Sequence, residues 1–261
     1  MTNTSNNTSG NHLTRQQLEI INRQTIQYPL PIAEKDYYLT LAIKLIYNSP
    51  LKAKLVFKGG TALHHSYLSQ KRFSEDLDFT SLDNELSKRE VISVLESSDV
   101  FLVKKVHSSK YTLKIERLQF QGLLGQPGNI KVEIDRFQNV VLDSVKKKYK
   151  NVWKVNSTAL IMDKREICAE KIRAVSQRAR YRDFYDLYFL INKLKIDYRE
   201  AVKLLKSKEI RTPVVAENII KNWSIAKKEK QNDLDGIYCS ESITDLKIEQ
   251  TIATIKFTKI K

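Results

Sequence analysis

Hydrophobic positions recur with two different periods along the chain, and the change of period divides the chain into two halves. Between residues 55 and 137, short apolar runs alternate with glycines, turns and charged residues, which is typical of strands mixed with helices. From Asp163 to near Lys230, apolar residues recur almost throughout at helical spacing. We therefore predict an α+β fold class, with a mixed sheet and helices followed by a mostly helical C-terminal half.

The boundaries of the expected elements follow from this periodicity and from breaker residues. Pro29 and Pro31 separate the first two helices, because proline disrupts a helix interior. Predicted strands cover residues 55–57, 76–80, 101–107, 111–120 and 130–137. Predicted helices cover residues 13–27, 33–49, 61–70, 84–98, 163–179, 182–193, 198–208 and 213–230, while residues 241–261 fit either a helix or a strand.

The same pattern suggests three segments. We expect residues 1–30 to form a flexible N-terminal extension, since the first dozen residues are rich in Asn, Ser and Thr. Residues 31–155 are expected to form the mixed α/β core. Residues 156–261 are expected to form a helical C-terminal domain.

Composition changes this picture little, but it excludes some classes of protein. Apolar residues make up 41% and charged residues 29% of 261 residues, the balance of a soluble globular protein. No apolar run reaches the roughly 20 residues that a membrane helix needs, and the N-terminal residues lack the apolar segment of a secretory signal. Cys168 and Cys239 are too few for a disulfide framework. We expect a cytoplasmic protein without a membrane partner.

The net charge of the chain indicates the class of partner that it binds. Lys and Arg number 45 against 30 Asp and Glu, which gives a net charge of +15 and a pI of about 9.6. A surplus of this size favours an anionic partner, with nucleic acid first among them. A role in solubility alone is the simpler alternative.

Two aspartates on one predicted strand are the first candidates for chemistry. Side chains alternate along a strand, so Asp76 and Asp78 share one face while Leu77 and Phe79 point to the core. Two carboxylates this close repel each other unless a cation lies between them. Mg²⁺ prefers such oxygen ligands together with substrate phosphates. The alternative is a strand end with two solvated aspartates.

A glycine turn precedes these aspartates. Gly59 and Gly60 follow a predicted buried strand, and their missing Cβ atoms allow a sharp turn and close approach of a ligand. Backbone amides at the following helix start can bind phosphate, and Thr61 can add a hydroxyl. A tight strand-to-helix turn is the alternative. The turn and the Asp-x-Asp pair together favour a site for a nucleoside triphosphate and its metals.

A third carboxylate is expected from a neighbouring strand. In residues 130–137, Glu133 and Asp135 share one face and lie between apolar residues that take the other face. We prefer Glu133, which lies in mid-strand, and Asp135 stays open as the alternative. A solvated strand face also stays open for both.

These motifs resemble the nucleotidyltransferase superfamily and, within it, the AbiEii toxin family of abortive-infection and toxin–antitoxin systems. Further blocks similar to that family are residues 34–40, the strand containing Lys131–Ile134, and residues 169–190. The superfamily usually has Gly-Ser where this chain has Gly60-Thr61. The residues that match the main motif are Gly59, Gly60, Leu63, Tyr67, Arg72, Ser74, Asp76, Leu77, Asp78 and Phe79.

The resemblance implies roles for residues that the sequence alone leaves open. It implies that Lys171 and Asp183 belong to the active site. The sequence alone favours a lysine whose stem packs on a helix while its ammonium reaches water over one that neutralises triphosphate charge in the site. Arg72 and Ser74 fit either phosphate contacts or an anchor for the loop before the aspartates.

Together these inferences predict a metal-dependent nucleotidyltransferase. Asp76, Asp78 and Glu133 are expected to hold two Mg²⁺ ions, with an NTP as substrate. The resemblance implies a toxin that transfers nucleotides to an RNA acceptor such as tRNA and is countered by a cognate antitoxin. Alternatives are transfer to a small molecule or a protein, and a catalytically inactive basic module that binds nucleic acid.

Overall fold

The structure is a computed structural model that describes residues 12–260. Residues 1–11, which belong to the predicted extension, lie outside the described residues. Within the rest of that extension, helix α1 (Arg15–Gln24) begins at Thr14, whose side chain accepts a hydrogen bond from the Gln17 amide. Leu18 of α1 is fully buried, and α1 packs on α2 (Leu30–Tyr47).

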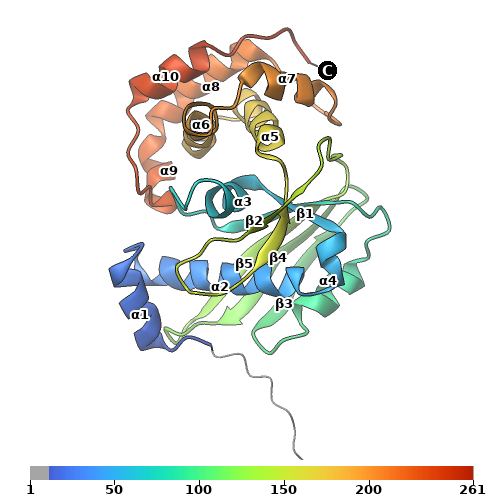
Figure 1. Ribbon diagram of the computed structural model, residues 1–261, viewed down its shortest axis with the longest axis vertical. Coiled ribbons are helices and arrows are strands. Elements are labelled where there is room, and N and C mark those ends of the chain that lie inside the picture. Colours follow the sequence, from blue (N-terminus) through green and yellow to red (C-terminus); the bar gives the residue numbers. More distant parts are fainter. Residues whose placement is uncertain (1–11, 261) are drawn as a thin grey trace, which may run out of the picture.

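A seven-stranded mixed sheet forms the centre of the first half and confirms the α+β prediction (Figure 1). Its spatial order is β3-β4-β5-β2-β1-β7-β6. Strand β2 pairs antiparallel with β1 and parallel with β5, so it lies inside the sheet. The strands are β1 (Leu55–Lys58), β2 (Asp76–Ser81), β3 (Phe101–Ser108), β4 (Thr112–Gln121), β5 (Pro127–Asp135), β6 (Val145–Lys148) and β7 (Thr158–Ile161).

Alternating side chains give the sheet one buried face and one charged face. Leu77 and Phe79 of β2 are fully buried, as is Ile130 of β5, whereas the intervening residues are partly exposed. Helix α2 covers the buried face, where Tyr38 stacks on Phe120 with ring centroids 3.9 Å apart. The charged face is therefore free to form one wall of a cleft.

Short helices connect the strands. Helix α3 (Gly59–Ser66) follows β1 directly, and α4 (Lys88–Leu95) packs on β3. Ser87 accepts a hydrogen bond from the Glu90 amide and caps the start of α4.

The second half is helical, as predicted, and gathers at one end of the molecule (Figure 1). Helix α5 packs against α7 and α8, and the aromatic pair Phe184–Trp223 joins α6 to α8. In the ambiguous final segment, Asp245–Ala253 form a helix rather than a strand, and Ile260 forms an isolated bridge to Val214. These elements are α5 (Lys164–Gln177), α6 (Tyr181–Tyr188), a π-helix (Phe189–Lys193), α7 (Tyr198–Lys206), α8 (Ala216–Lys228), α9 (Lys230–Ile237) and α10 (Asp245–Ala253).

Two strands were not predicted. β6 lies in a lysine-rich stretch at the edge of the sheet, where most side chains are exposed and no apolar alternation marks the strand. β7 is only four residues long and pairs with β1 and β6. The sheet therefore extends past residue 155, the boundary that the sequence suggested. No helix among residues 12–260 is long and apolar enough to cross a membrane.

Candidate active site

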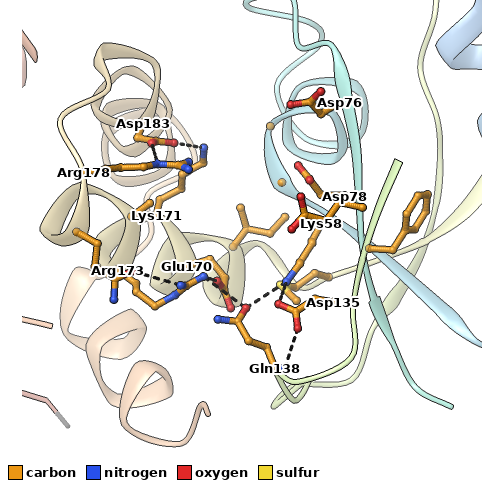
Figure 2. A pocket seen from close by; sticks show the side chains of 18 of the residues that line it. Lys58, Asp76, Asp78, Asp135, Gln138, Glu170, Lys171, Arg173, Arg178 and Asp183 are labelled. Carbon is orange, nitrogen blue, oxygen red and sulfur yellow. Dashed lines mark hydrogen bonds and ion pairs between the residues drawn. The ribbon is translucent and has the colours of Figure 1, made fainter. Parts of the chain in front are cut away.

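A cleft of about 660 Å³ lies between the charged face of the sheet and helices α5 and α6. Figure 2 shows its two walls, with Asp76, Asp78 and Lys58 on the sheet side and Lys171 and Asp183 on the helical side. The cleft brings together the predicted site residues Gly59, Gly60, Arg72, Ser74, Asp76, Asp78, Glu133, Lys171 and Asp183.

Strand register explains the sheet wall. Asp78 lies opposite Lys58 of β1 on one side and opposite Glu133 of β5 on the other. Glu133 in turn lies opposite Lys114 of β4. Neighbouring strands are about 4.8 Å apart, so these four side chains form one row across the charged face.

The two glycines allow the turn to approach this row. Gly59 has a φ of +77°, and a Cβ there would lie 2.4 Å from Asp78 Oδ2. A Cβ on Gly60 would lie 2.6 Å from Arg72 Nη2 and 2.7 Å from Ser74 Oγ. Any larger residue would collide with the site, which explains the Gly-Gly pair in physical terms.

Thr61 does not line the cleft. It is fully buried, and its hydroxyl donates a hydrogen bond of 2.6 Å to the carbonyl of Asp76. The expected contact between this hydroxyl and phosphate is therefore not supported, because the group already holds the start of β2.

Asp76 and Asp78 of β2 have too few positively charged neighbours to offset the cost of their burial. Burial, with a further contribution from Asp76, raises the pKa of Asp78 to about 6, although Lys58 opposes the shift. Burial also raises the pKa of Asp76, against the opposing charge of Lys131. Carboxylates in this condition are stabilised by a bound cation, and their oxygen atoms are ligands that Mg²⁺ prefers. The donor set therefore fits a divalent metal.

The contacts of Glu133 and Asp135 bear on which is the third carboxylate. Asp135 Oδ1 accepts hydrogen bonds from the amides of Phe137 (2.8 Å) and Gln138 (3.0 Å), and its Oδ2 lies 3.3 Å from Lys58 Nζ. Burial opposes ionisation of Asp135, but Lys58 and these amides lower its pKa. Among the described residues, the Glu133 carboxylate is paired with lysines alone, 3.2 Å from Lys114 Nζ and 4.0 Å from Lys131 Nζ. It has none of the backbone contacts that hold Asp135 in this part of the chain.

The three carboxylates do not yet converge on one point. Within residues 12–260, no group of three His, Cys, Asp or Glu side chains already forms a metal cluster. Glu133 is directed to Lys114, and repulsion separates carboxylates that have no cation between them. To bind a metal, the Glu133 carboxylate would have to leave Lys114 and turn to the ion.

The carboxylates of the helical wall are all paired with lysine or arginine side chains. Lys171 Nζ lies 2.8 Å from Asp183 Oδ1 and 2.7 Å from Asp186 Oδ2, and Arg178 Nε lies 2.7 Å from Asp183 Oδ2. Burial by itself would raise the pKa of Asp183, yet Lys171 and Arg178 hold it well below its usual range. Lys171 therefore faces the cleft as part of a buried network.

Arg72 is an anchor in this structure. Its guanidinium is 2% exposed and donates two hydrogen bonds of 2.7 Å to the Asp186 carboxylate, and a third to the carbonyl of Phe73. His64 Nε2 lies 2.8 Å from the same carboxylate. The roles of Lys58 and Asp186 were not predicted from the sequence, although the position of Lys58 directly before Gly-Gly was an available signal.

The rest of the cleft is strongly basic. This is the property expected of a surface that holds phosphates. The additional cationic residues that line it are Lys58, Lys114, Lys131, Arg173, Arg178, Arg180, Arg182 and Arg211.

Comparisons with known proteins agree with this arrangement. The sequence model described as nucleotidyl transferase AbiEii toxin, Type IV TA system, matches residues 42–237. A comparison with curated protein sequences finds no significant match.

Solved structures give the same fold. The structure of MenT4, a nucleotidyltransferase toxin from Mycobacterium tuberculosis H37Rv, is 20% identical with a TM-score of 0.63, over 93% of this chain and 99% of MenT4. A protein from H. pylori described as a proposed nucleotidyltransferase is 16% identical with a TM-score of 0.54, over 87% and 95% of the two chains. At these identities the likeness shows a shared fold.

Proposed function

This chain belongs to the AbiEii family of nucleotidyltransferase toxins, and from that premise we propose that it transfers a nucleoside monophosphate from an NTP to an RNA acceptor in a Mg²⁺-dependent reaction. Nucleotidyl transfer itself follows from the family. The observation that carries the finer proposal is the undercompensated pair Asp76 and Asp78 at the base of a basic cleft.

Asp76, Asp78 and Glu133 are the residues proposed to hold two Mg²⁺ ions. When bound, the metal neutralises phosphate charge and lowers the pKa of a hydroxyl nucleophile. Asp135 stays with Lys58 and orients the backbone that follows β5. Removal of any of the three proposed ligands is expected to reduce metal binding.

The glycine turn and the helical wall are proposed to hold the triphosphate. The first amides of α3, at Gly59 and Gly60, have no partner inside the helix and favour an anion. Lys171, held by Asp183 and Asp186, supplies a fixed positive charge across the cleft. Ser74, whose hydroxyl lies close to Gly60, is a further proposed contact.

RNA is the proposed acceptor because the basic residues extend beyond what one triphosphate needs. The net charge is +15, and lysines crowd α7 and α8 in the helical half. A tRNA-like acceptor, the cytoplasm as location and a cognate antitoxin protein as partner complete the proposal. We place the metal ligands and the glycine turn in a core of about residues 31–155, and Lys171 together with most acceptor contacts in a helical domain of residues 156–261.

The test is incubation with each labelled NTP in turn, Mg²⁺ and total RNA, followed by electrophoresis. We expect label to enter RNA with one preferred NTP, and EDTA to abolish the product. Asp78→Asn should give none. Label on protein, or on a small molecule, would replace RNA as the acceptor; no labelled product with any NTP would contradict the proposal.

A further inference from the structure

Two aromatic rings, one that lines the cleft and one in contact with it, have no role in the site described so far. Tyr111, in the turn between β3 and β4, is 43% exposed, and Phe137 follows β5 and lines the cleft. Their ring centroids are 5.6 Å apart, and the ring planes are at 88°. An exposed tyrosine next to a basic cleft is unusual for core packing and typical of a surface that binds a planar group.

A planar group already occupies these rings. The guanidinium carbon of Arg211 lies 4.2 Å from the ring centroid of Tyr111 and 4.2 Å from that of Phe137. Arg211 comes from the segment between α7 and α8, so the contact joins the two walls. Apart from these two ring contacts, the Arg211 side chain forms no hydrogen bond or ion pair with any of residues 12–260.

The backbone that carries the rings is held in place independently of Arg211. The carbonyl of Tyr111 accepts a hydrogen bond of 2.9 Å from the Arg136 amide, and Ser109 Oγ accepts one from the Tyr111 amide. The Phe137 amide is bound by Asp135. The rings therefore form a platform that exists before any ligand arrives.

The platform and the proposed phosphate site come from strands on opposite sides of β2. The sheet order is β4-β5-β2-β1; Tyr111 precedes β4 and Phe137 follows β5, whereas the glycine turn and α3 follow β1. In phosphoryl and nucleotidyl transfer, the attacking and leaving oxygens are roughly in line on opposite sides of the reacting phosphorus. If the triphosphate lies at the glycine turn, the acceptor approaches from the side of the aromatic rings.

We propose that Tyr111 and Phe137 form a stacking site for the unpaired terminal base of the acceptor, occupied by the Arg211 guanidinium until the acceptor binds. The assignment rests on the RNA acceptor proposed above. Stacking of a base on an aromatic ring is stronger than an exposed cation–π contact, so the base displaces the guanidinium. Arg211 then faces the adjacent backbone phosphate, for which its planar donors are suited.

The direct test is a single-stranded RNA whose terminal acceptor nucleotide is 2-aminopurine, a base whose fluorescence is quenched on stacking. Wild-type protein, without NTP, is expected to quench it at saturation. Tyr111→Leu should abolish most quenching and raise the KM for RNA roughly tenfold, with the KM for NTP unchanged. Tyr111→Phe, which keeps the ring, should retain quenching.

Two further variants separate stacking from a structural link between the walls. Arg211→Ala should retain quenching at saturation, because it removes the competitor and leaves the rings. Tyr198→Leu removes an aromatic ring beside Arg199 that does not line the cleft, and it should leave quenching and both KM values unchanged. A melting temperature for each variant verifies folding.

The outcomes are distinguishable from those that test the proposed function. Absence of RNA binding and of RNA transfer by the wild type would contradict the acceptor itself. Transfer to RNA with no quenching, or Tyr111→Leu and Arg211→Ala losing quenching equally, would overturn the stacking site alone. A rise in the KM for NTP in Tyr111→Leu, with the KM for RNA unchanged, would also overturn it, because the rings would then hold the base of the NTP.

Discussion

On the sheet wall of the cleft, burial raises the pKa values of Asp76 and Asp78, and the charge of Asp76 raises that of Asp78 further. On the helical wall, Asp183 and Asp186 are almost completely buried, and their pKa values lie well below the usual range because lysine and arginine partners outweigh the cost of burial. Aspartate carboxylates thus have few cationic partners on the sheet wall and several on the helical wall.

The difference indicates what each wall is for. A buried carboxylate with cationic partners from several elements ties those elements together, and its loss leaves the partners unpaired. Carboxylates with too few positively charged partners destabilise the fold. A bound cation removes this cost, so their presence on the sheet wall indicates a cation site. The sheet wall thus has carboxylates suited to bind a metal, whereas the carboxylates of the helical wall link structural elements and hold Lys171 in place.

The largest expected effect is on catalysis from the sheet wall. Asp78→Asn should lower nucleotidyl transfer on the order of 1,000-fold, because it removes a metal ligand and with it several kcal/mol of transition-state stabilisation. Asp135→Asn, on the same face, should cost far less, since Asp135 binds Lys58 and two amides. Initial rates with labelled NTP measure both; equal losses would make Asp135 the third carboxylate.

The next largest effect is on stability from the helical wall. Asp186→Asn removes the negative charge that Arg72, Lys171 and His64 share, and should lower the free energy of unfolding by about 3–5 kcal/mol. Asp76→Asn should cost nothing in the absence of metal. Urea denaturation compares them. Similar losses in both variants would remove the distinction between the walls.

A pH dependence should come from His64 of α3, which contacts Asp186 on the helical wall. Burial, assisted by Arg72, lowers the pKa of His64 to about 4, so the folded protein keeps this imidazole neutral while the unfolded chain takes up a proton below about 6.5. The stability from neutral His64 is thus present above pH 6.5 and is lost as the pH falls toward 4, by up to about 3 kcal/mol.

His64→Gln tests this by removing the titrating group while keeping a hydrogen-bond donor to Asp186. The variant should show a flatter change in unfolding free energy between pH 4 and 6.5 than the wild type. Identical slopes would mean that His64 does not titrate in this window.

Local patterns predicted the elements of the sheet wall well. Alternation placed Asp76 and Asp78 on one face of β2, and the glycine turn was placed between β1 and α3, although α3 begins at Gly59 rather than Thr61. Strong local periodicity is sufficient for such predictions. Thr61 shows the limit, because a hydroxyl can bind either a ligand or a nearby carbonyl, and the sequence does not distinguish them.

Contacts between distant segments were not predictable. The choice between Glu133 and Asp135 depends on Lys58, which precedes Asp135 by 77 residues and reaches it only because β1, β2 and β5 are neighbours in the sheet. The role of Arg72 depends in the same way on Asp186, 114 residues later. Strand register and helix docking decide these pairs, and neither can be read from one local pattern.

The central claim is that a divalent cation supplies the charge that the sheet wall lacks. The most direct measurement is the free energy of unfolding at pH 7, with and without saturating Mg²⁺, for wild type, Asp78→Asn and Asp197→Asn, whose carboxylate caps α7 away from the cleft. We expect Mg²⁺ at 100 times its Kd to stabilise wild type and Asp197→Asn by about 2.7 kcal/mol. Asp78→Asn should gain little, and without Mg²⁺ it should be at least as stable as the wild type. Equal stabilisation of all three proteins, or of none, would contradict the claim.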